Sequence, residues 1–344
     1  EVSMFRKILI ANRGEIAVRI IRAARELGIE TVAVYSTADK EALHTLLADE
    51  AVCIGPAKST ESYLNMNAVL SAAVLTGSEA IHPGFGFLSE NSKFATMCEE
   101  VGIKFIGPSG SVMDMMGDKI NARAQMIKAG VPVIPGSDGE VHSAEEALKV
   151  ADRIGYPVML KASAGGGGKG IRKVERAEDL VPAFESASTE AKAAFGNGAM
   201  YLERVIYPAR HIEVQILADQ FGHVVHLGER DCSLQRNNQK VLEESPSVAI
   251  GKTIRDQIGS AAVRAAESVG YENAGTIEFL YDEGKGEFYF MEMNTRVQVE
   301  HPVTEFVTGI DIVKEQIKIA EGQELSVRQE DIQISGHAIE CRSN

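Results

Sequence analysis

The 344-residue sequence has no tryptophan, only four cysteines, and no apolar run approaching the roughly 20 residues that span a bilayer. Cys53, Cys98, Cys232 and Cys341 are scattered without a CxxC pair, which argues against a zinc site or a disulfide framework. Basic residues are outnumbered, with 35 Lys and Arg against 49 Asp and Glu and a net charge of −14, so nucleic acid is not expected as a partner. We expect a cytoplasmic protein with reduced thiols and no membrane contact.

The N-terminal "FRKILIANRG" is too short and too quickly polar for a signal peptide, and Met4 is expected to mark the natural start. Short β-rich runs then alternate with amphipathic helices over residues 4 to about 110, for example "KILIA" followed by "GEIAVRIIRAARELG". This alternation predicts a parallel, doubly wound sheet. The first βα turn, "ANRGE", has a single glycine, so the GxGxxG fingerprint of an NAD-dependent dehydrogenase is absent there.

The rest of the chain reads differently. One helix is predicted over "SVMDMMGDKINARAQMIKAG", followed by a linker rich in Pro and Gly, and a small α+β unit is predicted over residues 140 to about 205. Beyond it lie strands that read as antiparallel, such as "HIEVQILAD" and "GTIEFLYD". The sequence stops after "GHAIECRSN" without a closing element, so we expect it to be cut short.

The stretch "ASAGGGGKGIRKV" places four glycines between two predicted strands. It does not fit a P-loop, and its GxGxxG match at Gly165, Gly167 and Gly170 is weak because a strand follows instead of a helix. Two interpretations remain: a flexible surface turn, or a flap laid over phosphates. Lys119 and Lys161 each follow apolar residues, which favours ammonium groups that face inward and reach phosphate oxygens.

The stretch "EFYFMEMNTRVQVEHP" carries the most chemistry. Alternation along a strand would place Glu292, Asn294, Arg296, Gln298 and Glu300 on one face. An exposed polar face is the alternative, but amides interleaved with Glu and Arg favour a functional cleft. The run is long for one strand, which leaves open a bend into a loop at its end.

Glu278, in "GTIEFLYD", is a second carboxylate flanked by apolar residues. Together with Glu292 and Asn294 it would form the oxygen-only ligand set that Mg²⁺ prefers. Arg296 could then bind a carboxylate-like anion through both arms of its guanidinium group, and Glu300 could accept a proton from that anion.

At this point the sequence resembles the ATP-grasp superfamily, and closely resembles the biotin carboxylase family. The motifs "ILIANRGEIAVRIIRAARELG", "IHPGFGFLSEN", "KASAGGGGKG", "RHIEVQILAD", "ERDCSLQ", "EMNTRVQVEHPVTE" and "GHAIECR" carry the resemblance over nearly the whole chain. It implies an α/β and α+β ATP-grasp fold: a Rossmann-like domain over residues 4–117, a linker with a central helix over 118–139, a lid over 140–206, and an incomplete C-terminal domain over 207–344.

The resemblance also implies site residues. Catalytic roles fall on Lys240, Arg296, Glu300 and Arg342, with Glu300 as general base and Arg342 binding biotin and stabilising its enolate. Two Mg²⁺ or Mn²⁺ ions would be held by Glu278, Glu292 and Asn294, and bicarbonate by Lys240, Arg296, Gln298, Val299 and Glu300. ATP contacts would be Lys119, Lys161, Gly167, Gly168, Glu203, Arg204, Val205, Ile206, His211, Gln235, Asn238, Glu278, Leu280 and Glu292. Asn238, in "QRNNQK", stands where family members usually have His.

The activity implied is ATP-dependent carboxylation of biotin through carboxyphosphate, the first half-reaction of acetyl-CoA carboxylase, which supplies malonyl-CoA for fatty acid synthesis. No "MKM" motif occurs, so biotin is expected on a separate carboxyl carrier protein, with carboxyltransferase subunits as further partners. The full-length form is expected to dimerise, and this shorter chain is not. A pyruvate or other acyl-CoA carboxylase, another ATP-grasp ligase, and a nucleotide-binding but inactive fragment remain alternatives.

Overall fold

The computed structural model describes residues 4–163, 170–237 and 239–343, and the chain forms two compact units. Residues 132–209 and 282–289 make up the smaller unit, and the remaining residues make up the larger one. The Rossmann-like region and most of the C-terminal region therefore belong to one unit. Among the described residues, no helix is both long enough and apolar enough to cross a membrane.

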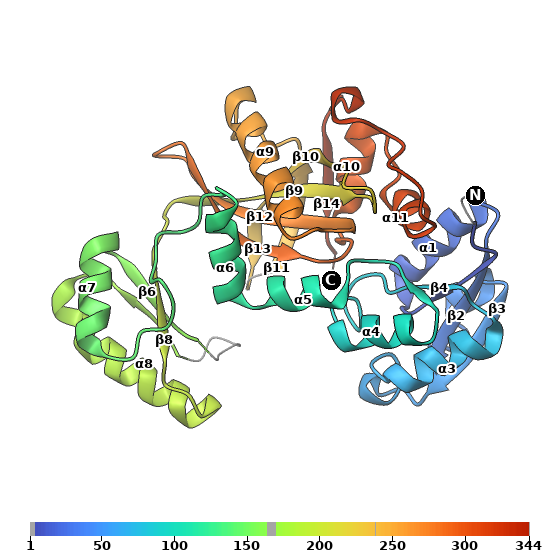
Figure 1. Ribbon diagram of the computed structural model, residues 1–344, viewed down its shortest axis with the longest axis horizontal. Helices are drawn as coiled ribbons and strands as arrows, with labels where there is room; N and C mark the ends of the chain where they lie inside the picture. Colours follow the sequence, from blue (N-terminus) through green and yellow to red (C-terminus); the bar gives the residue numbers. More distant parts are fainter. Residues whose placement is uncertain (1–3, 164–169, 238, 344) are drawn as a thin grey trace. The chain divides into compact units, whose positions relative to one another are not determined.

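The larger unit begins with a parallel sheet whose strands follow the order β3-β2-β1-β4-β5 (Figure 1). Its strands are β1 Lys7–Ile10, β2 Glu30–Ser36, β3 Glu50–Gly55, β4 Ala80–His82 and β5 Lys104–Phe105. Strand order reverses at β1, and every recorded pairing is parallel. The predicted doubly wound parallel sheet is confirmed.

Helices cover both faces of this sheet, and most of them bury apolar side chains against it. Ile16 and Ile20 of the first helix pack with Ile317 on one face, and Val69 and Phe94 pack on the other. The helices are α1 Gly14–Glu26, α2 Leu43–Leu47, α3 Met66–Thr76, α4 Ser92–Glu100 and α11 Ile312–Ala320.

The helix predicted over residues 111–130 is in fact two helices. They are α5, Gly110–Gly117, and α6, Lys119–Lys128. Asp118 separates them in an extended conformation, and its carboxylate accepts hydrogen bonds from the backbone N–H groups of Ile120 and Asn121, both at 3.0 Å. Asp118 is thus an N-cap, and helical periodicity alone did not reveal the break.

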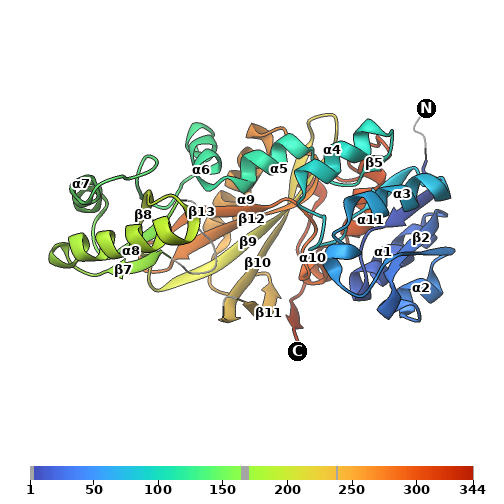
Figure 2. The same cartoon turned by 90° about the horizontal axis from the view of Figure 1, so that it is seen from below.

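A six-stranded sheet follows, in the order β13-β12-β9-β10-β11-β14 (Figure 2). Its strands are β9 Ala209–Ala218, β10 Val224–Arg236, β11 Gln239–Ser245, β12 Asn273–Asp282, β13 Glu287–Asn294 and β14 Ala338–Cys341. The pairs β9–β10, β10–β11 and β11–β14 are antiparallel, as predicted for this region. Helix α9, Lys252–Ser268, packs against β10, and α10, His301–Thr308, follows β13. This sheet carries Lys240, the three predicted metal ligands, and His211, Gln235 and Leu280 of the predicted ATP contacts.

The smaller unit holds a three-stranded sheet of order β7-β6-β8, with two helices packed on it. Its elements are β6 Val158–Ala162, β7 Ile171–Val174, β8 Met200–Arg204, α7 Ala144–Ile154, α8 Leu180–Phe195 and the 3-10 turn Ala177–Asp179. The larger unit has 3-10 turns at Thr37–Asp39, Ser59–Glu61 and Gln329–Asp331. Strands β6 and β7 pair antiparallel on either side of the glycine stretch. The prediction that this stretch joins two strands is confirmed, while Gly167 and Gly168 themselves lie outside the described residues.

Candidate active site

The polar column predicted on one strand is divided between a strand and a loop. Strand β13 ends at Asn294, and residues 295–300 connect it to α10. The bend has a local cause: Pro302 lies in the first turn of α10, where its fixed φ suits a helix start, and Glu300 is the N-cap residue. The prediction of a single strand is therefore wrong beyond Asn294, and the bend left open at the end of the run is what the structure shows.

Lys240 on β11 lies at the centre of the site. Its Nζ donates hydrogen bonds to Glu213 at 2.6 Å, Glu278 at 2.7 Å and Glu300 at 2.8 Å. Burial alone would lower the pKa of Lys240, but the three carboxylates outweigh it and raise the pKa above its usual range. Lys240 is therefore a fixed positive charge that draws three strand and loop segments together.

Glu213 on β9 was not predicted as a site residue. It is buried, and its other oxygen accepts a 2.5 Å hydrogen bond from Nε of Arg230, a fully buried guanidinium. Burial would raise the pKa of Glu213, but Arg230 and Lys240 outweigh that effect and lower it. Arg230 also binds Gln215, Thr276 and Thr304, so its remaining donors are satisfied. The alternation of "HIEVQ" on a buried strand was the available signal for Glu213.

Glu300 has a cation on each of its carboxylate oxygens. Lys240 binds Oε1, and Arg342, which follows β14, donates to Oε2 at 2.6 Å. The Glu300 side chain is about 1% exposed. Arg342 also approaches Glu243 on β11 to 2.6 Å. The structure thus brings three of the predicted catalytic residues into direct contact.

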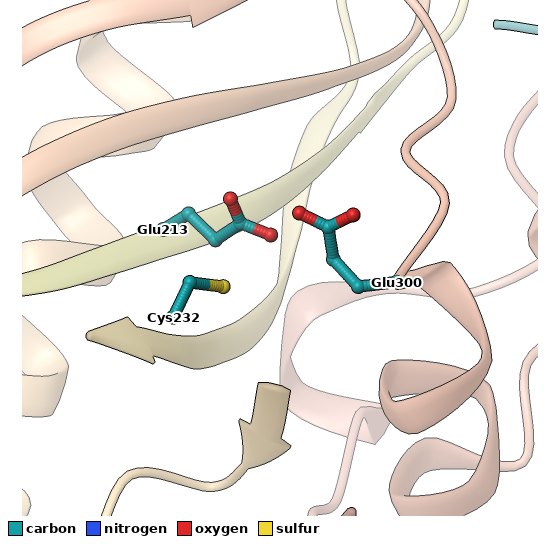
Figure 3. A group of neighbouring side chains, drawn as sticks. All are labelled: Glu213, Cys232 and Glu300. Atoms are coloured by element: carbon teal, nitrogen blue, oxygen red, sulfur yellow. The ribbon is translucent and has the colours of Figure 1, made fainter. Parts of the chain in front are cut away.

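The carboxylates of Glu213 and Glu300 point toward one another, and the thiol of Cys232 lies beside them (Figure 3). Donor atoms of the three residues lie within 4.8 Å of one another. Because Lys240 binds both carboxylates, an ammonium group already supplies their positive charge. Burial, followed by the field of Glu213, raises the pKa of the Cys232 thiol, which keeps it neutral. This group is held by cations of the protein and does not need a metal.

The predicted metal ligands lie on two neighbouring strands, Glu278 on β12 and Glu292 and Asn294 on β13. Nδ2 of Asn294 donates to Oε1 of Glu278 at 2.9 Å, the oxygen that also binds Lys240. Neither of these contacts uses Oε2 of Glu278, and Glu292 is exposed. The donor set is all oxygen and two of its members are already joined, so these residues fit a Mg²⁺ site.

Arg296 is held in place by Glu90, a residue that no sequence pattern had indicated. Glu90 accepts hydrogen bonds from Nε of Arg296 at 3.0 Å and from the backbone N–H of Thr295 at 3.1 Å. Arg296 also donates to the side-chain oxygen of Gln298 at 3.1 Å. Nε2 of Gln298 is buried and has no hydrogen-bond partner among the described residues. Val299, half-buried, follows in the same loop.

The other predicted ATP contacts of the larger unit form no side-chain hydrogen bond with Lys240 or Glu300 in the described part of the chain. His211 lies on β9, where burial lowers its pKa and keeps the ring neutral. Gln235 on β10 donates to the carbonyl of Cys232 at 3.0 Å, and Leu280 on β12 is half-buried. Lys119 is exposed at the first position of α6, against the prediction of an inward-facing ammonium group, because it begins a helix instead of continuing one. Asn238 lies outside the described residues.

The smaller unit carries Lys161 on β6 and the segment Glu203–Ile206. Nζ of Lys161 donates to Oε2 of Glu203 at 2.5 Å across the β6–β8 pair. Arg204 donates to the hydroxyl of Tyr289 at 3.0 Å, and the N–H of Val205 donates to the carbonyl of Pro157 at 2.9 Å. Lys161 is thus only partly buried, with its ammonium paired to one acid.

The comparisons with known proteins agree with this arrangement. Two family profiles match, "Biotin carboxylase, N-terminal domain" over residues 4–113 and "Carbamoyl-phosphate synthase L chain, ATP binding domain" over residues 118–328. Among curated relatives, biotin carboxylase 1 of Bacillus subtilis is 60% identical over 99% of this chain and 76% of its own length. A pyruvate carboxylase subunit from Methanothermobacter thermautotrophicus is 57% identical, over 99% of this chain and 69% of its own length.

Solved structures lead to the same family. A biotin carboxylase–ATP analogue complex from Campylobacter jejuni is 54% identical with a TM-score of 0.90, covering 98% of this chain and 75% of that chain. The biotin carboxylase domain of the Hydrogenobacter thermophilus 2-oxoglutarate carboxylase, in complex with MgADP, ADP and bicarbonate, is 54% identical with a TM-score of 0.89 and covers 99% and 75%. The expected ATP-grasp fold is confirmed, and this chain belongs to the biotin carboxylase family of ATP-dependent ligases.

Proposed function

We propose that this chain carboxylates biotin borne on a separate carrier protein, with bicarbonate as the carboxyl source and ATP as the energy source. One observation carries the proposal: the carboxylate of Glu300 is buried between Lys240 and Arg342, one cation on each oxygen. Such a carboxylate is held at a fixed place and can take a proton from an anion that Arg296 and Lys240 bind. The unpaired, buried amide nitrogen of Gln298 supplies a further donor for that anion.

In the proposed reaction, bicarbonate loses its proton to Glu300, and one of its oxygens attacks the γ-phosphate of ATP. The P–O bond to ADP breaks, and carboxyphosphate forms. Carboxyphosphate separates into CO₂ and phosphate, and the phosphate removes the proton from the ureido nitrogen of biotin. That nitrogen then attacks CO₂, while Arg342 stabilises the enolate form of the ureido oxygen. Lys240 and Arg296 stabilise the negative charge of the reacting anions throughout the reaction. Because the two cations are already in place, they lower the barrier without reorganisation.

A divalent metal supplies charge neutralisation at the ATP phosphates when it is bound. Glu278, Glu292 and Asn294 would hold it, as Mg²⁺ or Mn²⁺ and as two ions. The relative crystallised with MgADP supports this part of the proposal. Hydrogen bonds from Lys240 and Asn294 hold the carboxylate of Glu278 in position, so this proposed metal ligand is already oriented.

The partners also belong to the proposal. Relatives include biotin carboxylases and a subunit of pyruvate carboxylase, so a biotin carboxyl carrier protein and carboxyltransferase subunits are the partners we infer. The acceptor that we favour for the full complex is acetyl-CoA, and pyruvate or another acyl-CoA is the alternative. We further infer a homodimer for the full-length form. The four cysteines are all free, which fits a cytoplasmic enzyme.

Phosphate release from ATP by the full-length protein tests the proposal, with bicarbonate and free biotin as variables. We expect hydrolysis that requires bicarbonate and is stimulated by biotin. Hydrolysis that ignores both, or that responds to an amino acid or purine intermediate instead, would assign the chain to another ATP-grasp activity. Binding of MgATP without any turnover would identify a nucleotide-binding module.

A further inference from the structure

Two carboxylates that no step above uses face each other next to Arg342. Glu243 on β11 and Glu340 on β14 are directly opposed in the antiparallel register. Side chains in such positions have Cβ atoms about 4.5–5.5 Å apart, and like charges there repel. Glu243 is fully buried and Glu340 is half-buried. The sequence therefore places two acids where a sheet ordinarily avoids them.

Both acids have carboxylate oxygens without a hydrogen bond in the described part of the chain, although Glu243 forms an ion pair with Arg342. Both oxygens of Glu243 and Oε2 of Glu340 are buried without a hydrogen-bond partner among the described residues. Arg342 approaches Glu243 to 2.6 Å, but its hydrogen bond goes to Glu300, and its Nε is also unpaired within that part of the chain. A single guanidinium is thus shared between Glu300 and Glu243, and Glu340 lies opposite Glu243. Two neighbouring carboxylates, one buried and one half-buried, share a proton more easily than they both ionise.

We propose that Glu243 and Glu340 are positioning residues for Arg342, and that the proton shared by this pair decides how firmly Arg342 is held on Glu300. With the proton present, the pair carries one negative charge, and Glu300 keeps the guanidinium. Without it, a second negative charge competes for Arg342 and draws it away from Glu300. The proposal rests on the function inferred above, since it assigns the pair a part in the biotin half of the reaction.

The surrounding charges favour a proton on the pair near neutral pH. Burial raises the pKa of Glu340 to about 7, and Glu243 and Glu300 add to that effect against Arg342. Glu15, on α1, adds a weaker effect of the same sign. The pKa of Glu243 is raised as well, mainly by burial, with Glu300 and Glu213 opposing Arg342 and Lys240.

Glu340→Gln is the informative variant, because an amide keeps the size of the acid and donates to Glu243 as a protonated carboxyl would. It therefore mimics the protonated pair at every pH. Glu267→Gln is the matched control, since Glu267 is an exposed acid on α9, outside the β11–β14 pair.

Thermal unfolding between pH 5 and 8 tests the shared proton without any assay of activity. A carboxyl whose folded pKa is raised stabilises the fold fully below its ordinary pKa, and that contribution is lost as pH rises through about 7. We expect Glu340→Gln to gain melting temperature relative to the native chain as pH rises from 5 to 8. Glu267→Gln should show no such gain. A difference that does not change with pH would overturn the shared proton.

Biotin-stimulated ATP hydrolysis against pH, in the full-length protein, tests the effect on Arg342. We expect the ratio of biotin-stimulated to unstimulated turnover to change around pH 7 in the native enzyme and in Glu267→Gln. In Glu340→Gln this ratio should remain constant up to pH 8, at the value that the native enzyme shows at pH 6. A merely structural role would lower both rates by one factor at all pH values, and that result would overturn the proposal. If the native enzyme shows no biotin stimulation, the proposed function fails, and the melting experiment still decides whether the proton is shared.

Discussion

Replacing Lys240 with methionine should destabilise the larger unit strongly. The Lys240 side chain is about 15% exposed, and its ammonium group binds three carboxylates at 2.6–2.8 Å. Removing one partner of a buried ion pair costs about 3–5 kcal/mol, because the remaining charge is left uncompensated. Glu213 keeps Arg230, and Glu300 keeps Arg342, so the loss should stay within that range instead of tripling. We expect a free energy of unfolding lower by about 3–5 kcal/mol at pH 8.

The sign of the pH dependence follows from the same contacts. In the native chain the lowered pKa of Glu213 gives stability that persists above its ordinary pKa and is lost only as pH falls through the lowered value. In Lys240→Met, the three carboxylates repel one another, and at least one binds a proton as pH falls from 8 toward 5.5. The deficit of the variant should therefore shrink over that range.

Urea denaturation followed by circular dichroism measures the effect, since the chain has no tryptophan. Lys252→Met is the control, because Lys252 pairs with Asp256 on the exposed face of α9. An exposed pair of this kind contributes little to stability, so this variant should unfold nearly as the native chain does. A loss below about 1 kcal/mol for Lys240→Met, or an equal loss at both pH values, would refute the reasoning that makes Lys240 the centre of the site.

Two further variants test single contacts. Glu90→Gln weakens the charge-assisted hydrogen bond that holds Arg296. In steady-state kinetics the apparent KM for bicarbonate should therefore rise about 10-fold, while the KM for ATP stays unchanged. A change in the KM for ATP alone would contradict this role. Lys161→Met removes a charge that we propose reaches the ATP phosphates and that pairs with Glu203 in the described part of the chain. The apparent KM for ATP should rise about 10-fold or more while the melting temperature stays within about 2 °C, and an unchanged KM would make Lys161 a surface charge.

Sequence patterns predicted the parallel sheet, the antiparallel strands and the strands around the glycine stretch, because periodicity and turn residues are local signals. They did not predict the break between α5 and α6, where the cap at Asp118 outweighs a continuous helical pattern. The bend after Asn294 was left open for a similar reason, since contacts with Glu90 and the start of α10 decide it.

The candidate site was predicted in part. Glu278, Glu300 and Lys240 were singled out by alternation or by family resemblance, and the structure brings them together. Arg230 and Glu90 were missed because each acts through a partner on another segment, which local patterns do not record. Glu213 was missed although the alternation of "HIEVQ" offered a signal for it. The opposed acids Glu243 and Glu340 became visible only through the β11–β14 register.

The most direct test of the proposed chemistry compares Glu300→Gln with Glu292→Gln in the full-length protein. Glu300 is assigned to bicarbonate and Glu292 to the metal, so MgATP binding by calorimetry and bicarbonate-dependent turnover should separate them. Glu300→Gln should bind MgATP nearly as the native enzyme does and lose about 10²- to 10⁴-fold in turnover, because an amide cannot accept the proton. Glu292→Gln should weaken MgATP binding itself. Loss of nucleotide binding in Glu300→Gln as severe as that in Glu292→Gln would place both residues at the metal and contradict the assignment of Glu300 as the base.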